Sequence, residues 1–152
     1  MLSLFRTRRS DGGAALVEFA LVMPILVLIL GGIVEFGWLF AQNLNVRHGA
    51  REGARLVAVN YNPNGTTGGN QTLDIVDEIC GRMDTLSGAS IALAGSGDVG
   101  DPATATVQAP GTTITGLLDW AIPPGLMLSS TVEIRLEQPA TWADTVLPQT
   151  CP

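Results

Sequence analysis

The longest uninterrupted apolar stretch of the chain lies near its N-terminus. Between residues 12 and 41 the only charged side chains are Glu18 and Glu35, and the centre of the stretch, Phe19–Val34, carries no charge. A helix that crosses a bilayer needs about 20 mostly apolar residues. The pattern therefore predicts a membrane-spanning helix. Pro24 and Gly31-Gly32 do not argue against it, because membrane helices tolerate glycine and proline better than soluble ones.

Pro24 predicts a local irregularity within this helix. Proline has no amide hydrogen, so the bond to the carbonyl of Ala20 is missing, and the proline ring crowds that carbonyl. We expect a bend or a loosened turn near residues 20–24.

The helical pattern continues beyond the apolar stretch. From Gln42 to Val59 there is no proline, and small residues recur at a spacing of four: Ala50 and Ala54 on one line, with Gly49 and Gly53 beside them. Small residues at this spacing allow another backbone to approach closely. At a rise of about 1.5 Å per residue, a helix over residues 14–60 would be much longer than a bilayer is thick. Its neighbouring stripe of arginines is either a solvated face or a subunit contact: Arg47, Arg51 and Arg55.

The remainder predicts a small α+β domain. Residues 61–71 are rich in turn formers and read as a linker. Residues 72–83 have an amphipathic helical pattern, whose apolar face contains Leu73, Val76, Ile79, Cys80 and Met83. Residues 91–94, 103–108 and 127–137 alternate or favour β-branched residues, as strands do. We expect a domain over residues 72–152 with a short helix and an antiparallel sheet.

The amino-acid composition argues against several classes of function. The net charge is −6 and lysine is absent, so no basic patch for nucleic acid is expected. His48 is the only histidine, which argues against a serine-histidine-aspartate arrangement, and a phosphate-binding loop would need a lysine. We expect no enzymatic activity, no cofactor and no metal site.

The two cysteines, Cys80 and Cys151, are far apart in sequence and form no CxxC pair. In an oxidising compartment they would form one disulfide. A disulfide is favoured because Cys151 lies next to the chain end, which normally frays unless it is tied down. The alternative is two free, buried thiols.

The basic residues before the apolar stretch indicate its orientation. Arg6, Arg8 and Arg9 favour a cytoplasmic N-terminus, an extracytoplasmic domain and a single-pass protein of the cell membrane. The arginines after the stretch weaken this charge argument. A cleaved secretory signal fits poorly, because the stretch is too long and lacks a small-x-small cleavage site.

Glu18 is unusual, because an ionisable side chain within a spanning segment is costly and usually functional. Residues 13–19 read Gly-Ala-Ala-Leu-Val-Glu-Phe behind a short basic leader, 1–13. This resembles the processing site of type IV prepilins, which a membrane aspartyl prepilin peptidase cuts after the glycine. The resemblance implies cleavage between Gly13 and Ala14, with Phe19 following the functional glutamate. Glu18 would neutralise the new Ala14 amine of a neighbouring subunit.

The longer stretch over residues 13–59 resembles the TadE-like family, pseudopilins of the tight-adherence (Flp) pilus system. The resemblance rests on GAALVEFAL, Pro24, the pair Glu35-Phe36 and the run from Ala50 to Arg55. It implies a minor component or assembly factor of the pilus, with prepilin peptidase, other pilin-like subunits and tight-adherence assembly proteins as partners. The related TadG proteins share much of this signature.

Two other functions are compatible with a membrane anchor. An uncleaved single-pass adaptor of a pilus or secretion assembly would not need the glycine site. A tethered extracytoplasmic enzyme would need a catalytic constellation, which the sequence does not offer.

Overall fold

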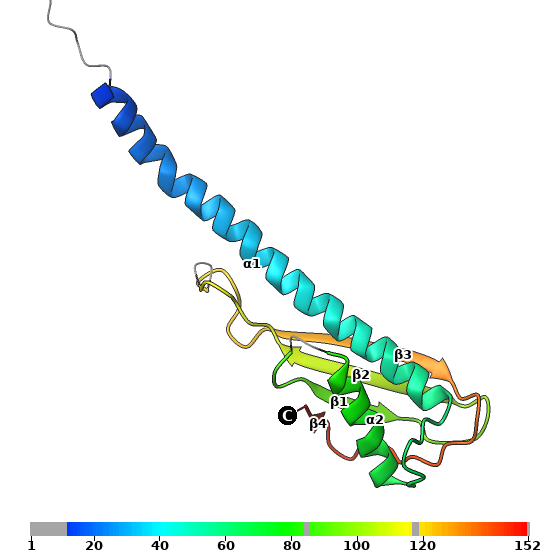
Figure 1. The fold of residues 1–152 in the computed structure, drawn as a ribbon. Helices are drawn as coiled ribbons and strands as arrows, with labels where there is room; N and C mark the ends of the chain where they lie inside the picture. Colours follow the sequence, from blue (N-terminus) through cyan, green and yellow to red (C-terminus); the bar gives the residue numbers. More distant parts are fainter. Residues whose placement is uncertain (1–11, 84–85, 117–118, 152) are drawn as a thin grey trace, which may run out of the picture.

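The chain folds into one very long helix with a small α+β head packed along its C-terminal half (Figure 1). The structure is a computed structural model, and it describes residues 12–83, 86–116 and 119–151. Two helices and four strands succeed each other along the chain: α1 Gly12–Ala58, α2 Gly69–Gly81, β1 Ser90–Ala94, β2 Pro102–Pro110, β3 Met127–Arg135 and β4 Gln149–Thr150. The predicted α+β class and the long N-terminal helix are confirmed.

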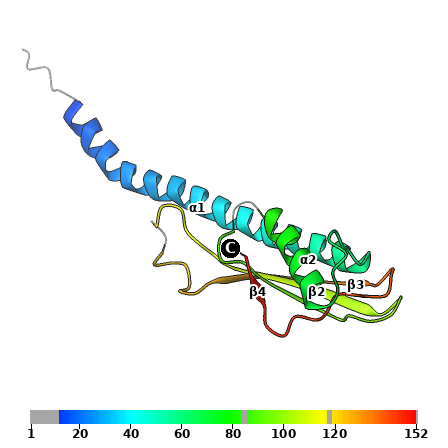
Figure 2. The same ribbon diagram turned by 60° about the horizontal axis from the view of Figure 1, so that its bottom comes forward.

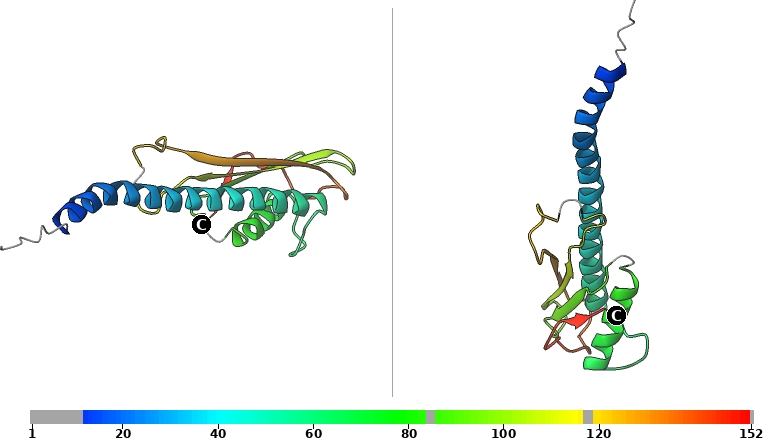
Figure 3. Two further views of the ribbon diagram at one scale, coloured as in Figure 1. Left: turned by 90° about the horizontal axis from the view of Figure 1, so that it is seen from above. Right: turned by 90° about the vertical axis from the view of Figure 1, so that its left-hand side faces the viewer.

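The two halves of α1 have different surroundings. Up to about residue 34 its apolar side chains are mostly exposed, whereas Val46, Ala50, Ala54 and Val57 are buried against the head. Among the described residues, α1 is the one helix long and apolar enough to cross a membrane. The helix is unbroken through Pro24, and its blue N-terminal turns leave the axis of the rest (Figure 3, left). The bend expected near residues 20–24 stays a prediction.

The C-terminus of α1 is closed by backbone hydrogen bonds. Asn60 adopts a left-handed φ of 53°, which lets its N–H bond the carbonyl of Val57 at 3.2 Å while the Tyr61 N–H bonds that of Leu56 at 2.9 Å. This pair of bonds is the Schellman arrangement, in which asparagine is one of the few residues besides glycine that tolerates the required conformation. The helix ends here because its last carbonyls are satisfied.

The four strands form one antiparallel sheet in the order β3-β2-β1-β4. β2 pairs along its full length with β3, from Pro102↔Arg135 to Pro110↔Met127, and on its other edge with β1. Strand alternation puts one side chain in two toward α1 and α2: Ile91, Leu93, Ala103, Ala105, Val107 and Ala109 are fully buried on that face. In β3, Val132 and Ile134 face inward and Glu133 and Arg135 outward, as the sequence predicted.

The apolar face of α2 differs in part from the prediction. Val76, Ile79 and Met83 are buried as expected, but Leu73 is 46% exposed. The helix begins at Gly69 rather than at residue 72, and Gln71 lies in the interior with no exposed surface. Gln71 is accommodated because its amide donates to Asn60 Oδ1 at 2.9 Å and to the Tyr61 carbonyl at 3.0 Å, while Thr141 Oγ1 donates to its oxygen at 2.6 Å.

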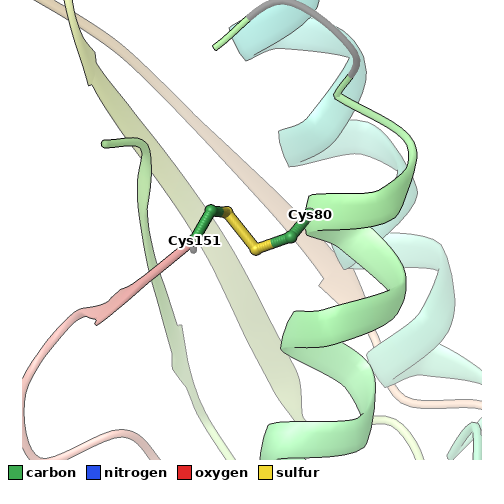
Figure 4. The surroundings of a disulfide bond; sticks show 2 residues. All are labelled: Cys80 and Cys151. Carbon is green, nitrogen blue, oxygen red and sulfur yellow. A yellow bond between two sulfur atoms is a disulfide. The ribbon is translucent and has the colours of Figure 1, made fainter. Parts of the chain in front are cut away.

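The chain end returns to the sheet through β4, which the sequence did not predict. β4 pairs with β1 at Ser90↔Thr150 and Ile91↔Gln149. Cys151 follows it and is bonded to Cys80 on α2 (Figure 4). The predicted disulfide is confirmed, and it ties the last strand to the second helix across a sequence separation of 71 residues.

Candidate processing and assembly site

The proposed scissile bond lies in the first turn of α1. Gly12–Ala58 are helical, so Gly13 and Ala14 are helical too. No atom lies within 4 Å of the position that a Cβ on Gly13 would occupy. The basic leader up to residue 11, with Arg6, Arg8 and Arg9, lies outside the described residues. A protease that binds extended backbone must unwind this turn, and glycine makes unwinding easier because it costs a helix about 1 kcal/mol relative to alanine.

Glu18 and Phe19 lie just beyond this bond, on an exposed part of the helix. Phe19 is 60% exposed, and the apolar residues before and after it in the helix are exposed as well. A helix that is apolar all round is normally buried in lipid or in a helical bundle. The surface around Glu18 therefore suits a bilayer or other apolar helices.

Glu35, at the far end of the apolar stretch, is fully buried. It accepts hydrogen bonds from the backbone N–H groups of Ile114 at 2.9 Å and Thr115 at 2.8 Å, and from the Thr115 hydroxyl. These groups belong to the long connection between β2 and β3. A buried carboxylate is costly unless it is hydrogen-bonded in this way. Glu35 thus holds the β2–β3 connection against α1.

Gln42 makes a second attachment two turns further along the same face of α1. Its amide donates to the Thr112 carbonyl at 2.8 Å and to the Thr112 hydroxyl at 3.1 Å, and its oxygen accepts from the Thr112 N–H at 3.0 Å. Sequence analysis picked out Glu35 only through the Glu35-Phe36 pair and missed Gln42. Their partner segment is 70 or more residues away in sequence, so no local pattern could reveal it.

Comparison with protein-family models gives a match at this end of the chain. Residues 13–55 match the TadE-like protein family. The match begins at Gly13, covers most of α1 and ends before α2 and the sheet. It agrees with the resemblance found in the sequence and supports a membrane protein associated with the tight-adherence pilus system. Searches of the curated proteins and of the solved structures found no match.

Within the TadE-like segment, the small residues contact the chain's own head. A Cβ on Gly49 would come within 2.4 Å of the Met83 sulfur, and one on Gly53 within 2.9 Å of Ile79 Cδ1 and 3.1 Å of Ala105 Cβ. Ala50 and Ala54 are buried in the same core. The close approach expected of these residues is therefore made by α2 and β2 of the same chain.

The arginines of the TadE-like segment lie on its exposed side. Arg47, Arg51 and Arg55 are exposed, and Arg55 pairs with Glu52 at 2.6 Å. Glu52 also pairs with Arg82, which follows α2 and bonds Glu78 at 2.6 Å. The hydrogen bond from Arg55, together with the charges of Arg55 and Arg82, lowers the pKa of Glu52 although burial opposes this. This network joins α1 to α2 at the surface.

The described residues contain no group of three or more His, Cys, Asp or Glu side chains that could hold a metal ion. What this part of the chain presents is a candidate processing sequence, an apolar helix surface and a head fixed to that helix.

Proposed function

We propose that this protein is a TadE-like pseudopilin, a minor component or assembly factor of a tight-adherence pilus that prepilin peptidase processes after Gly13. The observation that carries the proposal is the division of α1: a family match that begins at the candidate cleavage glycine, an exposed apolar half, and a second half built into a folded head. The role proposed is assembly rather than catalysis.

In this proposal the first half of α1 spans the cell membrane with its N-terminus in the cytoplasm. Arg6, Arg8 and Arg9 favour that orientation, and the head then lies on the extracytoplasmic side. A peptidase in the membrane could reach the Gly13–Ala14 bond at the cytoplasmic surface. The disulfide of the head suits the oxidising conditions outside the cytoplasm.

Cleavage leaves a charged amine on Ala14 that must enter an apolar environment. An unpaired ammonium in such a bundle is costly, and a carboxylate beside it offsets the cost. Glu18 lies four residues further on, about one turn, and is exposed. We propose that Glu18 receives the amine of an adjacent pilin-like subunit and so fixes the register of the two helices.

The test is processing of the full chain with and without a cognate prepilin peptidase, read by intact mass and N-terminal sequence. The wild type should begin at Ala14 only when the peptidase is present. Gly13→Val should block cleavage, because its side chain would crowd the extended backbone in the protease. The matched control is Gly37→Val, since Gly37 also has no atom within 4 Å of its Cβ position, and it should be cut normally.

Glu18→Ala separates processing from assembly. It should be cut like the wild type, because the residue lies a turn away from the scissile bond, yet it should fail to co-purify with pilin-like subunits. An intact leader on the wild type in the presence of active peptidase would overturn the proposal and favour an uncleaved adaptor.

A further inference from the structure

The described residues of the connection between β2 and β3, 111–116 and 119–126, extend past the rest of the head toward the N-terminal end of α1. Figures 1 and 2 show it in yellow beside the middle of the helix. Its base is closed by the bond from the Gly111 N–H to the Leu126 carbonyl at 2.8 Å.

Successive residues of this connection contact α1 at positions that lie progressively closer to the apolar stretch. Thr112 is bound by Gln42, whereas Ile114 and Thr115 are bound by Glu35. Seven residues of helix separate Gln42 from Glu35, about 10 Å along the axis. Three residues of the connection thus cover that distance in the direction of the membrane, and two buried side chains of α1 fix their position.

Glu35 and the connection that it binds lie at the expected surface of the bilayer. Residues 13–34 of α1 are about 33 Å long as a helix, close to the thickness of the hydrocarbon core. The next turn carries Phe36, Trp38 and Phe40, and aromatic residues gather at the membrane–water interface. Glu35 lies within this level, so the connection that it holds lies there too.

The side chains of the connection suit this location. Trp120 is 82% exposed and Ile114 is 55% exposed. Asp119 is the only charged residue in the sequence from 111 to 126, and it accepts a hydrogen bond from Thr113 Oγ1 at 2.8 Å. An exposed tryptophan on a nearly uncharged loop is poorly placed in water and well placed among lipid headgroups, where its ring and N–H are both satisfied.

We propose that the β2–β3 connection is a second membrane contact, which rests its Trp120 and Ile114 side chains in the headgroup region of the outer bilayer surface beside α1. The inference rests on the part of the proposed function in which α1 spans the membrane, and it does not depend on cleavage at Gly13. The occupant is lipid because the connection lies beside the aromatic turn of the spanning helix.

Three single-tryptophan variants of the full chain test this in vesicles of phosphatidylcholine and phosphatidylglycerol. Each retains Trp38, Trp120 or Trp142 and has phenylalanine at the other two positions. Trp142 is buried and its Nε1 has no hydrogen-bond partner among the described residues, so Trp142→Phe removes none of the hydrogen bonds that they make. The quenchers are lipids brominated at shallow or deep acyl positions and aqueous iodide.

Trp120 should be quenched by shallow-brominated lipid about as strongly as Trp38, and weakly by iodide, while Trp142 resists both. Strong iodide quenching of Trp120 without lipid quenching would overturn the inference. Protection of Trp120 from both quenchers would also overturn it, in favour of a protein partner. If Trp38 too escapes lipid quenching, the spanning helix itself is refuted. Lipid quenching of Trp120 in protein that prepilin peptidase leaves uncut would support this inference while the processing proposal fails.

Discussion

Glu35 is both a charged residue at the end of the apolar stretch and a hydrogen-bond acceptor for the head. Its position at the end of an apolar stretch makes its charge costly, yet the carboxylate accepts hydrogen bonds from two backbone N–H groups of the β2–β3 connection. The residue is therefore more than a polar boundary to the spanning helix. It sets the place at which the head meets the helix.

Replacing Glu35 should loosen that connection without unfolding the head. In Glu35→Ala the amides of Ile114 and Thr115 should exchange roughly ten- to a hundredfold faster, which corresponds to about 1.5–3 kcal/mol for hydrogen bonds to a charged group. Hydrogen exchange of the full chain, resolved to these peptides, measures this effect. Glu133→Ala is a matched control, because Glu133 is exposed on β3. Equal exchange in wild type and Glu35→Ala would refute the anchoring role.

At the scale of elements, the network of Glu52, Arg55 and Arg82 couples the two helices and makes their contact dependent on pH. The folded-state pKa of Glu52 is lowered from 4.5. Its contribution to stability is therefore fully present above pH 4.5 and is lost as the pH falls through the lower, folded-state value. At neutral pH a partly exposed network of this kind contributes about 1 kcal/mol.

Glu52→Gln should therefore melt below the wild type at neutral pH, and the gap should close as the solution is acidified below pH 4.5. Thermal unfolding of the full chain in detergent between pH 7 and pH 3 gives the comparison. A gap that stays constant over this range would show that the carboxylate charge does not act through its lowered pKa.

The elements predicted from the sequence are those whose pattern is long and regular. The apolar run Phe19–Val34 and the alternating pattern of β3 could be recognised in the sequence, because burial follows periodicity in a long helix and in a half-buried strand. Leu73 is exposed although it was expected on the apolar face, and Gln71 is buried although it was assigned to the linker. The burial of Gln71 depends on Asn60 and Thr141, which only the fold brings near. β4 has two residues and no pattern of its own.

Some parts of the candidate site could likewise be predicted from the sequence, and others could not. The motif from Gly13 to Phe19 is contiguous, so it could be read directly. The pairing of Cys80 with Cys151 was favoured over free thiols because Cys151 lies next to the chain end. The attachment of the β2–β3 connection to Glu35 and Gln42 was not predictable, because it depends on how the head docks on α1. The small residues at 49–54 were correctly seen as contact positions, but their periodicity carries no information on whether the partner is the same chain.

For the whole molecule, the disulfide closes the head by joining its last strand to α2. In the chain-entropy model a loop of this length adds about 4 kcal/mol to the free energy of unfolding. The Cys80→Ala, Cys151→Ala double variant should lose most of that in denaturant unfolding of the full chain in detergent. Reduced wild type should match the variant, and an unchanged unfolding midpoint in both would contradict the prediction.

The unbroken course of α1 from the apolar stretch into the core of the head has a mechanical consequence. Because Val46, Ala50 and Val57 are buried in that core, the C-terminal half of α1 and the head form one packed body. A displacement of this part of the helix along its axis therefore carries the head with it, by about 5.4 Å for each turn by which it advances past a neighbour. The head is thus coupled mechanically to the helix on which it is packed.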